Sequence, residues 1–93
     1  MFSVIFEWDD VKNASNIGKH GVSFATASRI FENRVVTYLD DRFDYGEKRE
    51  ISIRLIDEVL HLTVVHTGRD GKTRIISARR ANGAERKLYE EAL

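Results

Sequence analysis

The sequence predicts an α+β protein with an antiparallel sheet and helices packed on one face. Helical spacing of apolar residues is confined to the first third of the chain and to its end. Between these parts, apolar and polar residues alternate in successive segments that only a few turn residues separate. Strands joined by such short connections pair antiparallel. The expected order is β-α-α-β-β-β-β-α, in a single domain over residues 1–93.

The N-terminal third predicts a strand followed by a helix. Residues 2–8 alternate, which is typical of a half-buried strand. Asp9 is a favoured N-cap residue, and Gly21 is expected to end the helix in the left-handed conformation. We expect the apolar stripe of this helix to face the core; its members are Val11, Ala14, Ile17 and Gly18.

A second helix is predicted directly after the first. Ser23 is its expected N-cap, and the Asn33-Arg34 pair is expected to end it. Its apolar positions, at helical spacing, are Phe24, Ala27, Ile30 and Phe31. The short Gly21-Val22 link implies a tight corner between the two helices.

Four strands and a last helix are predicted in the remainder. The strands cover residues 35–39, 49–56, 59–67 and 73–79. A polar loop at 40–46, a tight turn at Asp57-Glu58 and a four-residue loop at 68–71 join them. Asn82 and Glu85 form a capping-box pattern that opens the last helix, with Ala84, Leu88 and Ala92 as its apolar positions.

The predicted core takes the apolar phases of these elements. Its expected members are Phe6, Trp8, Ile30, Phe31, Ile53, Leu62 and Val64. A domain of 93 residues buries only about two thirds of its unfolded surface, so its stability margin is small.

Composition excludes several kinds of site. The chain has no cysteine, so disulfides and thiolate chemistry are excluded. No apolar run is long enough to cross a membrane, and the N-terminal residues lack the pattern of a signal peptide, so a cytoplasmic location is expected. The net charge is zero, but residues 66–87 contain seven lysines and arginines against two acidic residues. This local excess predicts a positively charged surface.

Two ordered signatures, with a shorter element between them, resemble a known family. The first is Phe6-Glu7-Trp8-Asp9 with Lys12, Asn16 and residues 19–24 (KHGVSF). The second is residues 74–81 (RIISARRA) with Glu85-Arg86 and Tyr89, and Glu47-x-Arg49 lies between them. Together they resemble the BrnT family of ribonuclease toxins over nearly the whole chain.

The resemblance implies a RelE-like fold and an endoribonuclease that arrests translation. It also implies a cognate BrnA-like antitoxin that binds the toxin tightly. In such a complex the antitoxin contacts the operator DNA, so this chain meets DNA only indirectly. No cofactor is implied.

Metal-independent RNA cleavage fits the residue types available. The 2′-hydroxyl attacks the phosphorus, so the enzyme must take a proton, stabilise the phosphorane charge and protonate the leaving oxygen. Arginine suits the second task because its planar fork matches phosphate oxygens. No cysteine cluster, H-E-x-x-H motif or P-loop is present, so no metal site is predicted. The catalytic candidates are Arg79, Arg80, Arg74, Arg49, His66 and Glu47.

Strand alternation divides these candidates. It places Arg74, Ile76, Ala78 and Arg80 on one face, and Thr73, Ile75, Ser77 and Arg79 on the other. Two subsites are therefore open, one near Arg49, His66 and Arg74, the other near Arg79, Arg80 and Arg86.

Each candidate also has a structural alternative. An arginine can pair with an acid such as Glu85, and Glu47 with Arg49 can be a plain surface ion pair. His66 can be a residue at the edge of the core that bonds to backbone.

Further basic residues are predicted to contact RNA: Lys19, His20, Arg69, Lys72 and Arg86. For His20 a role as a cation at the helix C-terminus is the favoured alternative. Two other functions remain open. One is a non-catalytic antitoxin-binding subunit of an operon-repressing complex. The other is a stand-alone nucleic-acid binder, which the zero net charge disfavours.

Overall fold

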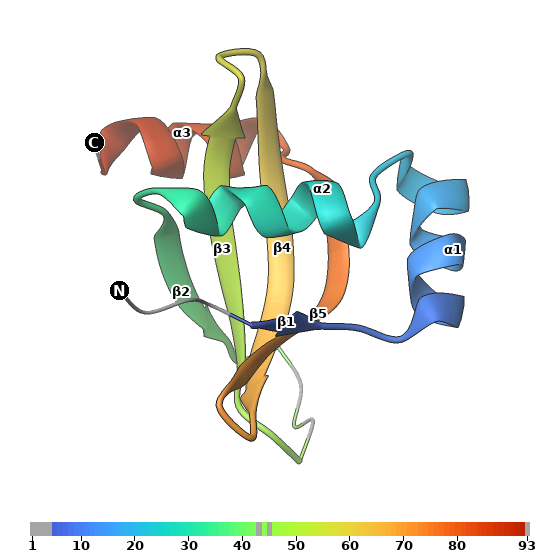
Figure 1. Ribbon diagram of the computed structural model, residues 1–93. Helices are drawn as coiled ribbons and strands as arrows, with labels where there is room; N and C mark the ends of the chain where they lie inside the picture. The colour runs from blue at the N-terminus through green and yellow to red at the C-terminus, as the bar shows by residue number, and fades with distance from the viewer. Residues whose placement is uncertain (1–4, 43, 45, 93) are drawn as a thin grey trace.

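The computed structural model describes residues 5–42, 44 and 46–92. Its elements are β1 (Phe6–Glu7), α1 (Asp10–His20), α2 (Phe24–Ser28), the 3₁₀ helix η1 (Arg29–Glu32), β2 (Val36–Asp40), β3 (Arg49–Ile56), β4 (Leu60–Arg69), β5 (Lys72–Arg80) and α3 (Gly83–Glu91). The strands form one sheet in the order β1-β5-β4-β3-β2 (Figure 1). The predicted α+β class and element order are confirmed. Residues 2–4 of the first predicted strand lie outside the described residues.

The sheet is antiparallel except at one edge. Strands β2 to β5 follow each other as an antiparallel meander. The short β1 pairs in parallel with β5, through Phe6 with Thr73 and Glu7 with Arg74. This pairing differs from the purely antiparallel expectation. Helices α1 and α2 lead the chain from β1 at one edge of the sheet to β2 at the other.

Two tight hairpins fix the register of the long strands. Asp57 and Glu58 have positive φ values of 52° and 64° and lie in the three-residue loop between the paired residues Ile56 and Leu60. The turn between β4 and β5 is Asp70-Gly71, with φ values of 51° and 76°. It is shorter than the predicted loop over residues 68–71, because the ladder extends to the pair Arg69 and Lys72.

The main core lies between α2 and one face of the sheet. Phe24, Ala27 and Ile30 are fully buried against Leu62 and Val64. Figure 1 shows α2 crossing this face in front of β3 and β4. Of the predicted core, Ile30, Ile53, Leu62 and Val64 are buried, whereas Phe6, Trp8 and Phe31 are partly buried and pack against the cluster.

Helix α3 lies on the opposite face of the sheet from α2 (Figure 1), so the expectation that the helices pack on one face is wrong for α3. Its Asn82–Glu85 capping box is confirmed. The predicted apolar stripe is wrong: Leu88 is 44% exposed, and the residues that α3 buries are Glu85 and Tyr89. Tyr89 packs edge-on against the His61 ring, with the ring centroids 5.7 Å apart. The polar contacts of Glu85 therefore fix which side of α3 faces the sheet.

Helix α1 has the predicted ends but not the predicted face. Asp9 accepts hydrogen bonds from the backbone of Val11 and Lys12, and Gly21 ends the helix with φ 69°. However, Val11 is 79% exposed and Ile17 is 45% exposed. The buried residue of α1 is Asn16, so the expected apolar contact with the core is wrong.

Asn16 holds α1 against the edge of β5. Its Nδ2 donates to the carbonyls of Val22 at 2.8 Å and Ala78 at 2.7 Å. Its Oδ1 accepts from the backbone N–H of Ala78 at 3.2 Å. Strand β1 pairs with β5 only at Thr73 and Arg74, so the Asn16 amide satisfies the edge of β5 beyond the end of β1.

Candidate nucleic-acid interface

A β-bulge in β5 rearranges the predicted faces of this strand. The ladder pairs Val65 with Ser77 and then His66 with Ile75, so Ile76 is an extra residue. Ile75 and Ala78 consequently both point into the core. The expectation that Arg74 shares a face with Ala78 and Arg80 is therefore wrong. By alternation from Ile75, Arg74 lies on the same face as Ser77 and Arg79.

Arg79 is bound to Glu85 on the α3 side of the sheet. Two parallel bonds join its Nη1 to Oε1 at 2.6 Å and its Nη2 to Oε2 at 2.8 Å. These bonds raise the pKa of Arg79 above its ordinary value. Burial alone would raise the pKa of Glu85, but hydrogen bonds from Arg79 and the Asn82 backbone hold it below its ordinary value. Arg79 thus has a fixed orientation and a neutralised charge.

Arg80 lies on the other face and is exposed. It lines a small cavity of about 120 Å³ together with Val59, Leu60, His61, Ala81 and Arg86. Neighbouring residues of a strand point to opposite sides, so Arg79 and Arg80 do not form one cluster.

Glu47 connects the hairpin between β4 and β5 to the start of β3. Its carboxylate accepts from Arg69 Nη2 at 2.9 Å and from Arg49 Nε at 3.3 Å. The bond from Arg69 is the main cause that lowers the pKa of Glu47, ahead of the bond from Arg49. A carboxylate stabilised in its charged form between two arginines is a weak proton acceptor. Arg74 also has an acidic neighbour, because its Nη1 lies 3.7 Å from Oε1 of Glu7.

His66 is buried on the face that α2 covers. Its Nε2 lies 2.7 Å from Ser52 Oγ, and its ring packs edge-on against Phe31. Burial lowers the pKa of His66, so the neutral ring is favoured. Strand alternation directs Arg49 and Arg74 to the opposite face. The predicted subsite of Arg49, His66 and Arg74 is therefore not brought together.

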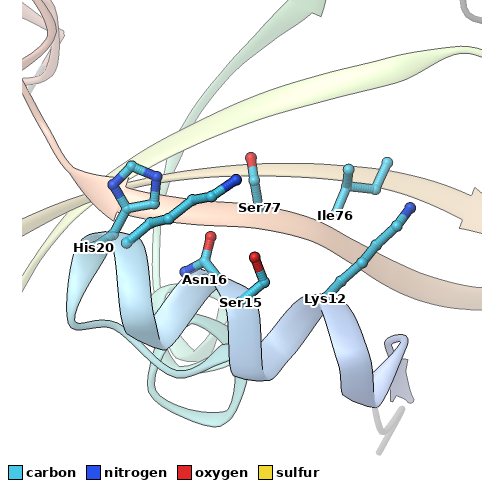
Figure 2. Close-up of a pocket in the computed structure, with 7 residues that line it drawn as sticks. Lys12, Ser15, Asn16, His20, Ile76 and Ser77 are labelled. Carbon is cyan, nitrogen blue, oxygen red and sulfur yellow. The ribbon is translucent and has the colours of Figure 1, made fainter.

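A basic groove lies between α1 and β5. It has a volume of about 210 Å³ and is lined by Lys12, Ser15, Asn16, Lys19, His20, Ile76 and Ser77. Figure 2 shows Lys12, Ser15 and His20 projecting from α1 on the side that faces Ser77. Asn16 forms the floor, because its amide joins the helix to the strand. We call this site the α1–β5 groove.

The groove is positively charged. Among the described residues its lining contains two lysines and a histidine but no carboxylate. Within the residues that the structure describes, no salt bridge joins Lys12 or Lys19 to an acidic side chain. Arg74, Arg79 and Arg69 each have one. The groove therefore holds cations whose charge an incoming anion can neutralise.

Lys19 and His20 were predicted from the sequence to contact RNA, and the structure places both in this groove. Lys12, Ser15 and Ser77 were missed as site residues. Spacing could have indicated the two residues of α1: Lys12, Ser15 and Lys19 are separated by three and four residues and so share one side of a helix. The other predicted RNA contacts, Arg69, Lys72 and Arg86, are exposed elsewhere on the hairpin and on α3.

Ammonium groups beside a hydroxyl and an imidazole suit phosphodiester chemistry. Lysine can neutralise charge on nonbridging oxygens, and imidazole can accept or donate a proton near neutral pH. Within residues 5–42, 44 and 46–92, no group of three or more His, Asp or Glu side chains is placed to hold a metal ion. Nor is any described helix long and apolar enough to span a membrane.

Comparisons with known proteins agree with this fold. Residues 8–85 match the model of the family described as the ribonuclease toxin BrnT of type II toxin–antitoxin systems. The fold is similar to the crystal structure of the Brucella abortus ribonuclease toxin BrnT, with a TM-score of 0.65 and 22% identity. That match covers 86% of this chain and 99% of the other. No curated protein sequence matches.

Proposed function

The chain belongs to the BrnT family of type II toxin–antitoxin ribonuclease toxins, and we propose that it cleaves RNA in the α1–β5 groove without a metal ion. The observation that supports this location is the lining of the groove, in which lysines, a histidine and hydroxyls meet without a carboxylate. A phosphodiester is the part of RNA that such a lining complements.

Each side chain of the groove has a role in this proposal. Lys12 and Lys19 contact the nonbridging oxygens and stabilise the charge of the phosphorane. His20 transfers the proton between the 2′-hydroxyl and the leaving 5′-oxygen. Ser15 and Ser77 donate hydrogen bonds that fix the position of the phosphate.

Of the arginines predicted from the sequence, Arg79 is the best placed to support this site. It lies two residues from Ser77 on the same face of β5, and Glu85 fixes its orientation. We propose that Arg79 contacts a phosphate next to the one that is cleaved. Arg74 lies on the same face toward the other end of β5 and extends this path.

The other predicted catalytic residues have supporting roles in the proposal. Glu47 and Arg49 order the start of β3 together with Arg69. His66 supports the contact between α2 and the sheet through Ser52 and Phe31. Arg80 contacts RNA outside the cleavage site.

The test is cleavage of single-stranded RNA by purified protein in EDTA. We expect Lys12→Ala, Lys19→Ala and His20→Gln each to lower the rate about a hundredfold or more. Lys87→Ala is the matched control, because Lys87 is an exposed lysine on a different helix, and it should cleave at the unmodified rate. Circular dichroism verifies that each variant folds.

Three results would contradict the proposal. Groove variants that cleave at the unmodified rate would place the site elsewhere, with Arg79→Ala and Arg80→Ala as the next variants to measure. Activity that disappears in EDTA would exclude the metal-free mechanism. A folded, unmodified chain that binds its antitoxin but does not cleave RNA would favour the non-catalytic subunit.

A type II toxin has an antitoxin partner. We propose that this partner is BrnA-like, that it supplies the contact with operator DNA, and that both proteins act in the cytoplasm, where the RNA substrate is. Co-expression of this chain with the adjoining open reading frame should yield a stable complex. Elution of each chain alone at low salt would count against this pairing.

A further inference from the structure

Helix α1 exposes an apolar stripe beside the groove. Val11, Ala14 and Gly18 follow each other at spacings of three and four residues and therefore share one side of the helix. All three are exposed, and Val11 has 79% of its surface accessible. Ile17, which is 45% exposed, extends the stripe on one flank. We call these four residues the α1 stripe.

The orientation of α1 is the reverse of that of an ordinary surface helix. Such a helix directs its apolar side to the core, whereas α1 directs Asn13 and Asn16 inward and its apolar side outward. The hydrogen bonds of the two asparagines fix this orientation. An exposed apolar surface beside a charged groove is typical of a binding site for another protein.

The α1 stripe and the α1–β5 groove are neighbouring strips of the same helix. Ser15 lies next to Val11 around the helix, and Lys12 and Lys19 follow toward the strand. A partner packed on the stripe therefore has the groove within reach of its side chains.

We propose that the antitoxin docks on the α1 stripe through an amphipathic helix and neutralises the toxin by placing carboxylates in the α1–β5 groove. This proposal rests on the groove being the RNA site. Carboxylates would then occupy the positions of the RNA phosphates, so binding of the antitoxin and of RNA would be mutually exclusive.

Shape and charge both favour an acidic helix as the occupant. The helix α1 has 11 residues, so it offers about 16 Å of length, enough for three turns of a partner helix. Ala14 and Gly18 add little bulk, and a Cβ built on Gly18 meets nothing within 4 Å, so a partner can approach closely. The charges of Lys12, Lys19 and His20 call for an acidic partner surface.

The test compares two valines of similar exposure, Val11 and Val59. Val11→Glu places a charge in the stripe, and Val59→Glu places one at the hairpin between β3 and β4, where Val59 is 82% exposed. A glutamate in the first turn of α1 favours the helix dipole, so Val11→Glu is expected to fold. Gly18→Glu is a second stripe variant, at the other end of the helix.

Affinity is measured for the product of the adjoining open reading frame, which is the proposed antitoxin, with RNA cleavage measured separately in its absence. We expect Val11→Glu and Gly18→Glu to weaken antitoxin binding about tenfold or more, because each buries an unpaired charge in the interface. Val59→Glu should bind the antitoxin as the unmodified chain does. All three variants should still cleave RNA, and the stripe variants should escape neutralisation.

A competition experiment tests the second half of the proposal. A 2′-O-methyl oligoribonucleotide, which cannot be cleaved by attack of the 2′-hydroxyl, should be displaced by the antitoxin from the unmodified chain. A ternary complex, unchanged antitoxin affinity in both stripe variants, or a dimer of this chain that Val11→Glu dissociates would each overturn the proposal. Failure of the groove as the RNA site is seen separately, in the antitoxin-free rates of the lysine variants.

Discussion

Replacing Asn16 by alanine removes the polar contact that holds α1 against the sheet. The side chain is 6% exposed and makes three hydrogen bonds, two to Ala78 and one to Val22. After truncation, the N–H and carbonyl of Ala78 and the carbonyl of Val22 lose this partner. Strand β1 cannot replace it at Ala78, because β1 pairs with β5 only at Thr73 and Arg74.

The expected cost follows from these three groups. A buried polar group left without a partner costs about 1–3 kcal/mol, and water entering from the adjacent groove offsets part of the sum. We expect the free energy of unfolding to fall by about 2–4 kcal/mol. In a domain of this size each kcal/mol lowers the Tm by about 4–8 °C, so the Tm should fall by roughly 10–25 °C.

Two other asparagines provide a graded control for thermal and urea unfolding. Asn13 is partly buried and accepts one bond, from the Phe24 N–H at 2.8 Å, so Asn13→Ala should cost about 1 kcal/mol. Asn33 is exposed, and Asn33→Ala should stay within about 0.5 kcal/mol. An Asn16→Ala variant as stable as Asn33→Ala would refute the role given to this amide. Asn16→Ala should also lose RNA cleavage at temperatures where it remains folded, since the groove depends on the position of α1.

Three further predictions concern the core and the charged contacts. Phe24→Ala should lower the free energy of unfolding by about 3–5 kcal/mol, and Phe31→Ala by less, because Phe24 is fully buried and Phe31 only partly; equal costs in urea unfolding would contradict this core. Burial lowers the pKa of His66, so stability should fall as the pH drops below about 6.5, where the unfolded chain gains the proton, and continue to fall down to the lowered folded pKa. Urea unfolding at pH 7 and pH 5.5 should show this loss in the unmodified chain and a smaller one in His66→Gln; equal losses would show that His66 is not its source. Glu85→Gln should cost about 1–2 kcal/mol, because it weakens the paired bonds to the partly exposed Arg79, and an unchanged Tm would show that this pair adds nothing to stability.

Local signals predicted the elements and their ends. The N-caps at Asp9, Ser23 and Asn82 and the left-handed Gly21 lie where the sequence placed them. Alternation located the long strands, and Arg49–Ile56 has the predicted bounds. These features depend on residues close together in the chain, which is why the sequence revealed them.

Features that depend on distant partners were not predicted. The orientation of α1 results from bonds between Asn16 and Ala78, 62 positions apart. The side of α3 that packs on the sheet is set by the hydrogen bond between Glu85 and Arg79, which lie on either side of a turn. A polar contact of this kind is an exception to the pattern in which apolar positions face inward. The bulge at Ile76 leaves no clear mark in the sequence, yet it changes the face to which Arg74 belongs.

The candidate site was predicted only in part. The local excess of charge and the motif around Lys19 and His20 indicated two groove residues. Sequence reasoning emphasised arginines as phosphate ligands, and in the structure Arg74 and Arg79 each lie beside a carboxylate. Which cations are already paired depends on the fold, so residue type alone did not favour Lys12 over Arg79.

Amide chemical-shift mapping tests the location of the RNA site most directly. The ¹⁵N-labelled chain is titrated with a short 2′-O-methyl oligoribonucleotide of mixed sequence, which binds but is not cleaved. We predict that the largest shifts follow the α1–β5 groove, over α1 from Lys12 to His20 and around Ser77. Shifts centred on Arg80 and Arg86, or on the Arg69–Lys72 hairpin, with the groove unaffected, would contradict the account.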